Sequence, residues 1–213
     1  VTSVLHKSQE ELEMLARKKV KHLYLGIESG LDDVLKFMKK DHDLAQAYQA
    51  IDRLHEAGLI YDAHIMTGVA GKGRGMENAE ALAQFLNRTN PAHVVNFSMF
   101  LHKEVPLYQD IRQGTFVPAD ELETIREEYH LIERIAPEKA GANILYDGFH
   151  DFIHVRVRGH LPGDKEKMLA KLNGIIQEYE GKEPVYSFVQ GECPDLEYCD
   201  DGKAVWDMDR KTS

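Results

Sequence analysis

Short apolar runs alternate with segments of helical periodicity along most of this chain, and this alternation constrains its fold more than any other feature. The runs over residues 22–27, 60–67 and 93–100 have the length of strands, and a polar or glycine-containing turn follows each of them. Between the runs, apolar residues recur at three- and four-residue spacing, as they do on the buried face of a helix. This order predicts an α/β fold with a parallel sheet and right-handed crossovers.

The predicted helices have recognisable ends. Ser8 and Glu11 have the spacing of a capping box, so the first helix is expected over residues 9–19. Gly58 is a typical C-terminal stop for the helix that begins near Leu44. The other helices are expected near residues 31–40, 76–90 and 120–135.

Parallel sheets carry their functional groups at the carboxyl ends of the strands. In this chain those ends are Glu28–Ser29, Thr67–Gly68 and Ser98–Phe100. A carboxylate at position 28 would accept two hydrogen bonds at once, which suits the hydroxyls or the amine of a ligand. The alternative is a cap, in which Ser29 begins the next helix and Glu28 faces solvent. Both interpretations stay open at this point.

The pattern changes after residue 140. Residues 152–158 alternate between polar and apolar side chains, which predicts a strand with one wet face, and an amphipathic helix follows Asp164. From Gly181 onward the chain is polar and acidic with little periodicity. We therefore divide the chain into residues 1–139, an extension over 140–180, and an acidic tail over 181–213.

The glycine-rich turn over residues 68–75 resembles a phosphate loop only loosely. A P-loop requires G-x-x-x-x-G-K-[ST], and here Lys72 is followed by Gly73. A tight turn from strand to helix is the favoured interpretation, although a close backbone approach to a ligand stays open. An unrelated binder of phosphate ligands that uses this turn is the weakest of our functional hypotheses.

No metal site is predicted from the spacing of histidines or cysteines. His150 and His154 lie four residues apart with His160 nearby, but a third ligand is not evident. Cys193 and Cys199 are the two cysteines of the chain, and two thiolates alone can neither close a zinc site nor hold a four-iron cluster. We expect ordinary surface or core histidines and free thiols, and the alternative for the two cysteines is a redox pair or a metal site completed by a partner.

Composition excludes several classes of protein. The formal net charge of −10 argues against nonspecific binding of nucleic acids. Two cysteines suggest a reducing compartment, so a cytoplasmic location is expected. No apolar run approaches the roughly 18–20 residues that span a bilayer, and no membrane association is expected. The chain begins with Val1 rather than Met, which suggests a piece of a longer protein.

Several segments, in this order and spacing, resemble the radical S-adenosylmethionine superfamily, nearest to its oxygen-independent coproporphyrinogen oxidases and methylthiotransferases. The strongest is LYLGIESGLDDVLKFMKK over residues 23–40, a strand ending in G-I-E-S followed by D-x-V-L-K-x-M-x-K. The others are the helix over 47–58, the T-G-V-A-G turn at 67–71, Pro106–Tyr108, and RGHLPGDKEK over 158–167.

The resemblance implies a partial (β/α)6 barrel, a TIM-like fold of which this chain supplies about three βα units, equivalent to strands four to six, plus a small α+β extension. In this superfamily the barrel holds S-adenosylmethionine on a [4Fe-4S] cluster. Reductive cleavage yields a 5′-deoxyadenosyl radical, which abstracts hydrogen from a substrate. The intact protein is thus expected to be an enzyme of the oxidoreductase, lyase or transferase class, with an unknown substrate.

The resemblance also assigns cofactor-binding residues. Glu28, with its neighbour Ser29, matches the residue of the fourth strand that binds the cofactor. Lys40 matches a basic residue near the cofactor carboxylate, and His64 stands where the coproporphyrinogen oxidase relatives have Asp. Ser98–Phe100 would lie by the adenine on the sixth strand.

One departure from the superfamily pattern is large. The C-x3-C-x2-C motif that ligates the cluster is absent from this sequence, as is the Gly-Gly-Glu segment of the second strand. We expect both to precede Val1 in the intact protein, so this chain alone should be inactive. A half barrel also leaves an open sheet edge, through which we expect self-association.

The alternative hypothesis is a non-catalytic interaction module. It would bind a protein partner through the open sheet edge or the acidic tail over residues 181–213. The absence of the cluster motif favours this alternative.

Overall fold

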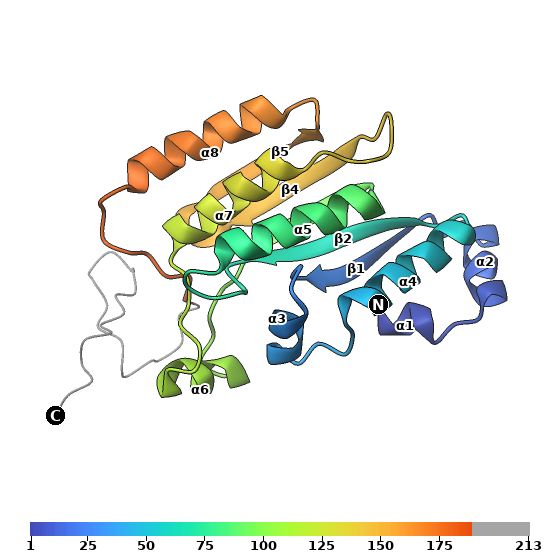
Figure 1. The fold of residues 1–213 in the computed structure, drawn as a ribbon, viewed down its shortest axis with the longest axis horizontal. Coiled ribbons are helices and arrows are strands. Elements are labelled where there is room, and N and C mark those ends of the chain that lie inside the picture. The colour runs from blue at the N-terminus through green and yellow to red at the C-terminus, as the bar shows by residue number, and fades with distance from the viewer. Residues whose placement is uncertain (189–213) are drawn as a thin grey trace.

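The computed structural model describes residues 1–188, and its centre is one five-stranded sheet (Figure 1). The strands lie side by side in the order of the sequence, and β1 to β4 are parallel while the last strand runs antiparallel to β4. The strands are β1 (His22–Glu28), β2 (Ile60–Thr67), β3 (His93–Ser98), β4 (Ile144–His150) and β5 (Val155–Leu161).

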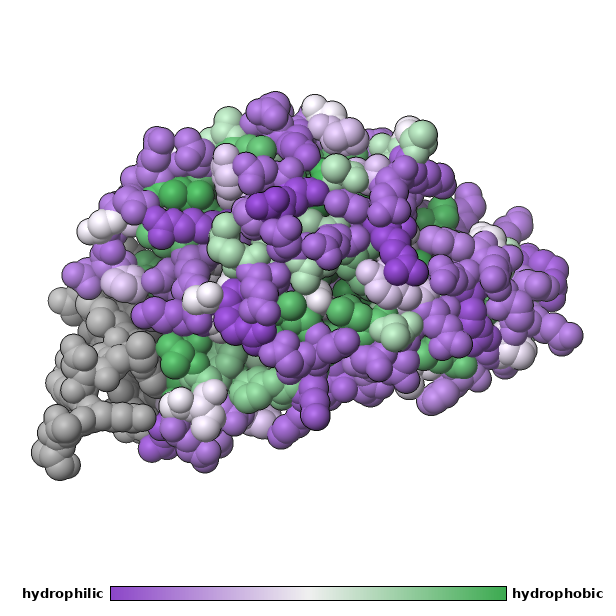
Figure 2. All heavy atoms as spheres, in the orientation of Figure 1, coloured by the Kyte–Doolittle hydropathy of each residue, from purple (hydrophilic) through white to green (hydrophobic). Residues whose placement is uncertain are grey.

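Four long helices cover one face of the sheet and leave the other face without them (Figure 1). They are α4 (Leu44–Glu56), α5 (Gly75–Thr89), α7 (Glu121–Arg134) and α8 (Lys165–Tyr179). Figure 2 shows this helix-covered side, where the outermost side chains are mainly hydrophilic.

The shorter helices lie at the two ends of the strands. Near the amino ends, α1 (Thr2–Leu5) and α2 (Gln9–Arg17) pack on α4. Beyond the carboxyl ends lie α3 (Asp32–Phe37) and α6 (Pro106–Gln113) (Figure 1). A single 3-10 turn, Asp151–Ile153, joins β4 to β5.

The hydrophobic core fills the space between the sheet and the four long helices. Alternate strand residues such as Ile27, Ile65 and Val94 point into it and are fully or almost fully buried. Leu82 and Leu86 of α5 meet them from the helix side. The three-residue spacing that predicted helices in the sequence is thus the spacing of this buried surface.

The remaining strand residues form what we call the inner face, the face of the sheet turned away from the four long helices. Across this face, register pairs place side chains of neighbouring strands next to one another. Its members include His22, Tyr24, Gly26, Glu28, Asp62, His64, Met66, His93, Val95, Phe97, Leu145, Asp147, Phe149, Arg156, Arg158 and His160.

The predicted α/β fold is confirmed, with three differences in detail. The helix predicted over residues 31–40 ends at Phe37, and Lys39 just beyond it has a left-handed backbone. The strand predicted over 152–158 begins at Val155, because the 3-10 turn and the left-handed His154 precede it. The capping box of Ser8 and Glu11 is present as predicted.

The third difference is that β4 and the short helices α1 and α6 were not predicted. β4 pairs with both β3 and β5, so the extension over 140–180 continues the same sheet. The tail also joins the fold at its start, where the carbonyls of Val185 and Ser187 accept hydrogen bonds from Glu121 and Leu101. Cys193 and Cys199 lie outside the residues that the structure describes.

A buried hydrogen-bond relay behind the sheet fixes the carboxyl ends of β1 and β2. The side chain of Asn78 on α5 accepts hydrogen bonds from the Ser29 hydroxyl at 2.6 Å and from the Gly30 amide at 3.1 Å. Its amide nitrogen donates to Glu127 of α7 at 2.7 Å, and Glu127 also accepts from the Gly68 amide at 2.8 Å. Two helices and two strand ends are therefore held together by two buried side chains, Asn78 and Glu127.

Replacing Asn78 by Ala should destabilise the fold by about 2 kcal/mol or more, because it leaves several buried polar groups without partners. Chemical denaturation of the variant and of the unaltered chain measures this difference. Asn173→Ala, at an exposed position of α8, is the control and should change stability by less than about 0.5 kcal/mol. Equal stability of the two variants would contradict the structural role of the relay.

Candidate functional site

The carboxyl end of β1 carries a Glu–Lys pair that folds back over the inner face. Glu28 has a left-handed backbone with φ of 62°, and its Oε1 accepts a hydrogen bond from Lys40 Nζ at 3.1 Å. Gly26 makes room for this pair, since a Cβ atom at that position would lie 2.6 Å from Glu28 Oε1. Both side chains keep a partly exposed surface, so their remaining hydrogen-bonding capacity faces solvent.

A row of aromatic rings crosses the inner face from β1 to β4, and the guanidinium of Arg156 on β5 continues it. His64 on β2 lies between Tyr24, at 5.1 Å between ring centroids, and Phe97, at 6.0 Å. Phe97 stacks on Phe149 of β4 at 5.5 Å, and the guanidinium of Arg156 lies 4.7 Å from the centre of the Phe149 ring. His64 is therefore on the same face as Glu28, next to Gly26 in the register.

Two polar pairs lie nearer the amino end of this face. The Tyr24 hydroxyl and His93 Nδ1 are 3.0 Å apart, and His22 Nδ1 lies 2.8 Å from the buried Asp62 carboxylate. Burial lowers the pKa of His93 below its usual range, and the nearby Asp62 opposes that shift. A neutral His93 can accept the phenolic proton of Tyr24 in a hydrogen bond.

The six cofactor-binding residues predicted from the sequence do not all lie together. Glu28, Lys40 and His64 meet on the inner face. Ser29 is fully buried and donates its hydroxyl hydrogen bond to Asn78, while the Ser98 hydroxyl donates to Glu121 of α7 at 3.2 Å. Both serines thus belong to the polar network behind the sheet, and Phe100 is exposed beyond the end of β3.

Sequence reasoning missed a buried charged cluster between α7 and β4. His150 Nδ1 lies 3.0 Å from Glu121, and its Nε2 lies 3.1 Å from Glu128. Burial alone would lower the pKa of His150, but the two carboxylates outweigh it and raise the pKa to about 10. Glu128 also accepts hydrogen bonds from Tyr146 and Asn96, so the cluster joins α7 to two strands.

A signal for this cluster was present in the sequence of α7. Glu121 and Glu128 lie seven residues apart and in phase with the buried Ile125 and Ile132, so they share the apolar face of the helix. Burial also raises the pKa of the neighbouring Glu127 to about 8, although the hydrogen bonds from Asn78 and Gly68 oppose the shift.

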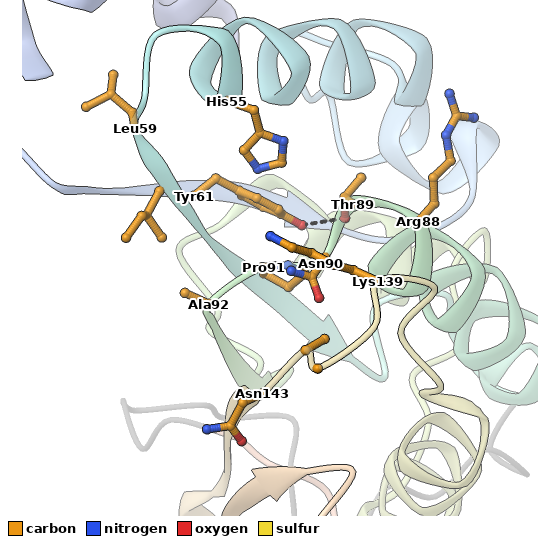
Figure 3. Close-up of a pocket in the computed structure, with 13 residues that line it drawn as sticks. His55, Leu59, Tyr61, Arg88, Thr89, Asn90, Pro91, Ala92, Lys139 and Asn143 are labelled. Atoms are coloured by element: carbon orange, nitrogen blue, oxygen red, sulfur yellow. Dashed lines mark hydrogen bonds between the residues drawn. The ribbon is translucent and has the colours of Figure 1, made fainter.

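The structure contains hollows away from the inner face. One of about 680 Å³ lies at the amino ends of β2 and β3, where His55, Arg88 and Lys139 line it and Tyr61 donates or accepts a hydrogen bond with Thr89 at 2.8 Å (Figure 3). It is at the opposite end of the strands from Glu28.

A second hollow, of about 370 Å³, lies beside the 68–75 turn. There the guanidinium of Arg74 is bound by Asp33 and Glu77. Because two carboxylates already neutralise this arginine, the turn is poorly suited to bind phosphate through it.

Two further findings concern residues 1–188. Within them, no group of three or more His, Cys, Asp or Glu side chains is arranged to hold a metal ion. No helix among these residues is sufficiently long and apolar to traverse a bilayer.

Comparison with known proteins supports the resemblance seen in the sequence. Residues 1–86 match the family model of the radical SAM superfamily. Over 119 residues the chain is 25% identical to a tRNA uridine(34) acetyltransferase of Methanocaldococcus infernus, an alignment that covers 55% of this chain and 22% of that protein. The chain therefore spans about a fifth of the curated relative it matches.

A solved structure shares the fold. It is the archaeal Methanocaldococcus infernus Elp3 with an N-terminal deletion, which matches 80% of this chain and 39% of its own with a TM-score of 0.58 and 18% identity. The α/β sheet and this neighbour confirm the predicted partial TIM-like barrel.

The charged cluster predicts how stability depends on pH. Folding raises the pKa of His150 from about 6.5 to about 10, so the folded state holds a proton that the unfolded chain has lost. The stabilisation of the folded state by this proton is complete below about pH 6.5 and is lost as the pH rises through 10. The free energy of unfolding should therefore fall between pH 7 and 9, by about 1 kcal/mol per pH unit.

Urea unfolding at several pH values measures this slope, and Glu127 adds to it below pH 8 because its pKa is raised as well. Carbon chemical shifts of the His150 ring provide a direct check, since the ring should remain protonated at pH 8. Loss of that proton below pH 7 would contradict the charged cluster.

Proposed function

We propose that this chain forms the carboxyl-terminal part of the barrel of a radical S-adenosylmethionine enzyme, which abstracts hydrogen from a substrate. The observation that carries this proposal is the Glu28–Lys40 pair, held over Gly26 at the carboxyl end of β1. The pair lies within the residues that match the superfamily model. Carboxyl strand ends are also where α/β barrels bind their ligands.

The polar groups of S-adenosylmethionine fit the donors and acceptors of this pair. Glu28 can accept hydrogen bonds from an ammonium group or from ribose hydroxyls, and Lys40 can donate to a carboxylate. When bound, this cofactor supplies the sulfonium whose cleavage provides the radical. Glu28 and Lys40 would bind and orient it, while the rings of Tyr24, His64 and Phe97 line the neighbouring surface.

Residues 1–188 cannot ligate the [4Fe-4S] cluster of the superfamily, because they contain no cysteine and hence no thiolate ligand. We therefore derive no step through the cluster from this structure. In the proposal its ligands belong to another part of the intact protein. Acetyl transfer, named for the curated relative, is not carried over because the alignment covers only 22% of that protein.

Substitution of Glu28 tests the proposal in the intact protein loaded with its cluster. Glu28→Gln removes the charge but keeps the size, and we expect the affinity for S-adenosylmethionine to fall about tenfold, equal to about 1.4 kcal/mol. Equilibrium dialysis measures binding, and release of 5′-deoxyadenosine under reducing conditions measures cleavage.

Lys36→Met is the matched control, because Lys36 is an exposed neighbour on α3. It should leave both measurements unchanged. Unaltered binding and cleavage in Glu28→Gln would show that this carboxylate does not serve the cofactor.

We keep the interaction module as a second candidate, because β1 is an edge strand and the inner face exposes aromatic side chains. Tyr24 is 52% exposed and Phe97 is 36% exposed. Exposed apolar rings beside an unpaired strand favour association with another chain. In this candidate the partner is a second copy of this chain.

Size-exclusion chromatography with light scattering tests this association. The apparent mass should rise above 24.3 kDa with concentration, and Phe97→Glu should reduce the rise by placing a charge on the inner face. Met76→Glu alters an apolar side chain on α5 that is even more exposed than Phe97, and it should have little effect. A monomer at all concentrations would exclude self-association.

A further inference from the structure

The inner face of β5 carries two arginines that share one carboxylate. Arg156 donates from Nε and Nη2 to Asp147 at 2.8 and 2.6 Å. Arg158 Nε lies 3.7 Å from the same carboxylate, within ion-pair distance but too far for a hydrogen bond. Asp147 is nearly buried, while both arginine side chains are about half exposed.

The charges of Asp147, Arg156 and Arg158 do not sum to zero. One carboxylate faces two guanidinium groups, which leaves an excess of one positive charge in a chain whose formal net charge is −10. Nη1 of Arg156 and the guanidinium N–H groups of Arg158 make no hydrogen bond to any side chain or backbone group in residues 1–188. These donors are free to bind a ligand.

The neighbouring rings favour a ligand of negative charge. Phe149 lies in the register between Phe97 of β3, whose ring is nearly parallel to it at 17°, and Arg156 of β5, whose guanidinium lies over the Phe149 ring. These neighbours cover the flat sides of the Phe149 ring. The ring therefore presents its edge to a ligand on the inner face of the sheet. Ring edges carry the positive end of the aromatic quadrupole, so they attract anions rather than cations.

We propose that Arg156 and Arg158 form a phosphate-binding subsite, and that the substrate of the intact protein carries a phosphate group. The two arginines are two residues apart on one strand, so their Cα atoms lie about 7 Å apart. A tetrahedral phosphate can accept from Nη1 of Arg156 and from the guanidinium of Arg158 at once, whereas a planar carboxylate satisfies one guanidinium fork.

The subsite belongs to the extension, outside residues 1–86 that match the superfamily model. The register joins it to the rest of the inner face, since Arg158 lies opposite Asp147 and Asp147 lies opposite Val95. That the phosphate belongs to the substrate rests on the proposed function. The binding of phosphate by the two arginines does not depend on it.

Arginines on an edge strand also have a purely structural role, because charge there prevents pairing with other sheets. That role requires charge but no selective binding. Selectivity for phosphate over other anions therefore distinguishes the two roles.

Titration of the chain over residues 1–213, with labelled arginine side chains, tests the subsite by nuclear magnetic resonance. The probes are phenyl phosphate, benzoate and phenol, which share a ring and differ in the charged group. We expect phenyl phosphate to shift the Nε–H signals of Arg156 and Arg158 saturably. Benzoate should bind at least about fivefold more weakly, and phenol should cause no saturable shift.

Arg158→Gln is the informative variant, because Arg158 makes no hydrogen bond whose loss would disturb the fold. It should weaken the binding of phenyl phosphate about tenfold. Arg17→Gln makes the same change of net charge on α2, where Arg17 is exposed, and should leave binding unchanged.

Equal affinity of the unaltered chain for benzoate and phenyl phosphate would overturn the assignment to phosphate. Unchanged binding in Arg158→Gln, or an equal loss in Arg17→Gln, would overturn the subsite itself. No cofactor is present in these titrations, so their failure is distinguishable from a failure of the Glu28→Gln test.

Discussion

The position of the candidate site depends on a hydrogen-bond relay that lies behind it. Asn78 connects Ser29 and Gly30, just after Glu28, with Glu127 on α7. The left-handed backbone of Glu28 is an unfavourable conformation for a residue with a side chain. A fully satisfied buried network next to it supplies the rigidity that such a backbone requires. The direction in which Glu28 points is therefore set from the helix side of the sheet.

The general fold could be predicted because its signals are local. Apolar runs of strand length and capping residues such as Ser8 depend on neighbours within a few positions. β4 was missed because buried polar residues and a glycine interrupt the apolar pattern of its sequence, ILYDGFH. Asp147 and His150 find their partners on other elements, Arg156 and Glu121, and such pairs are not visible in a local pattern.

The candidate site was also predictable only in part, because some of its features follow from local sequence and others depend on distant partners. The position of Glu28 at a strand end follows from topology, and Lys40 lies in the same matched segment. The hydrogen-bond partners of Ser29 and Ser98 are Asn78 and Glu121, which are 49 and 23 residues away in the sequence and are not visible in a local pattern. Strand alternation alone would have placed Ser98, like Asn96, on the side opposite Phe97. Applying that alternation would have separated the buried serine from the inner face.

Gly148 restricts which substitutions this sequence can accumulate during evolution. A Cβ atom at Gly148 would collide with the carboxylate of Glu128, which passes directly over that position to reach β4. Glu128 in turn binds His150, Tyr146 and Asn96. A larger residue at position 148 is therefore tolerated only after Glu128 has been replaced by a residue with a shorter side chain. That replacement leaves three buried side chains without their hydrogen-bond acceptor. The two positions are coupled, so that substitutions at them must occur in a fixed order, and related sequences that retain Glu128 should also retain Gly148.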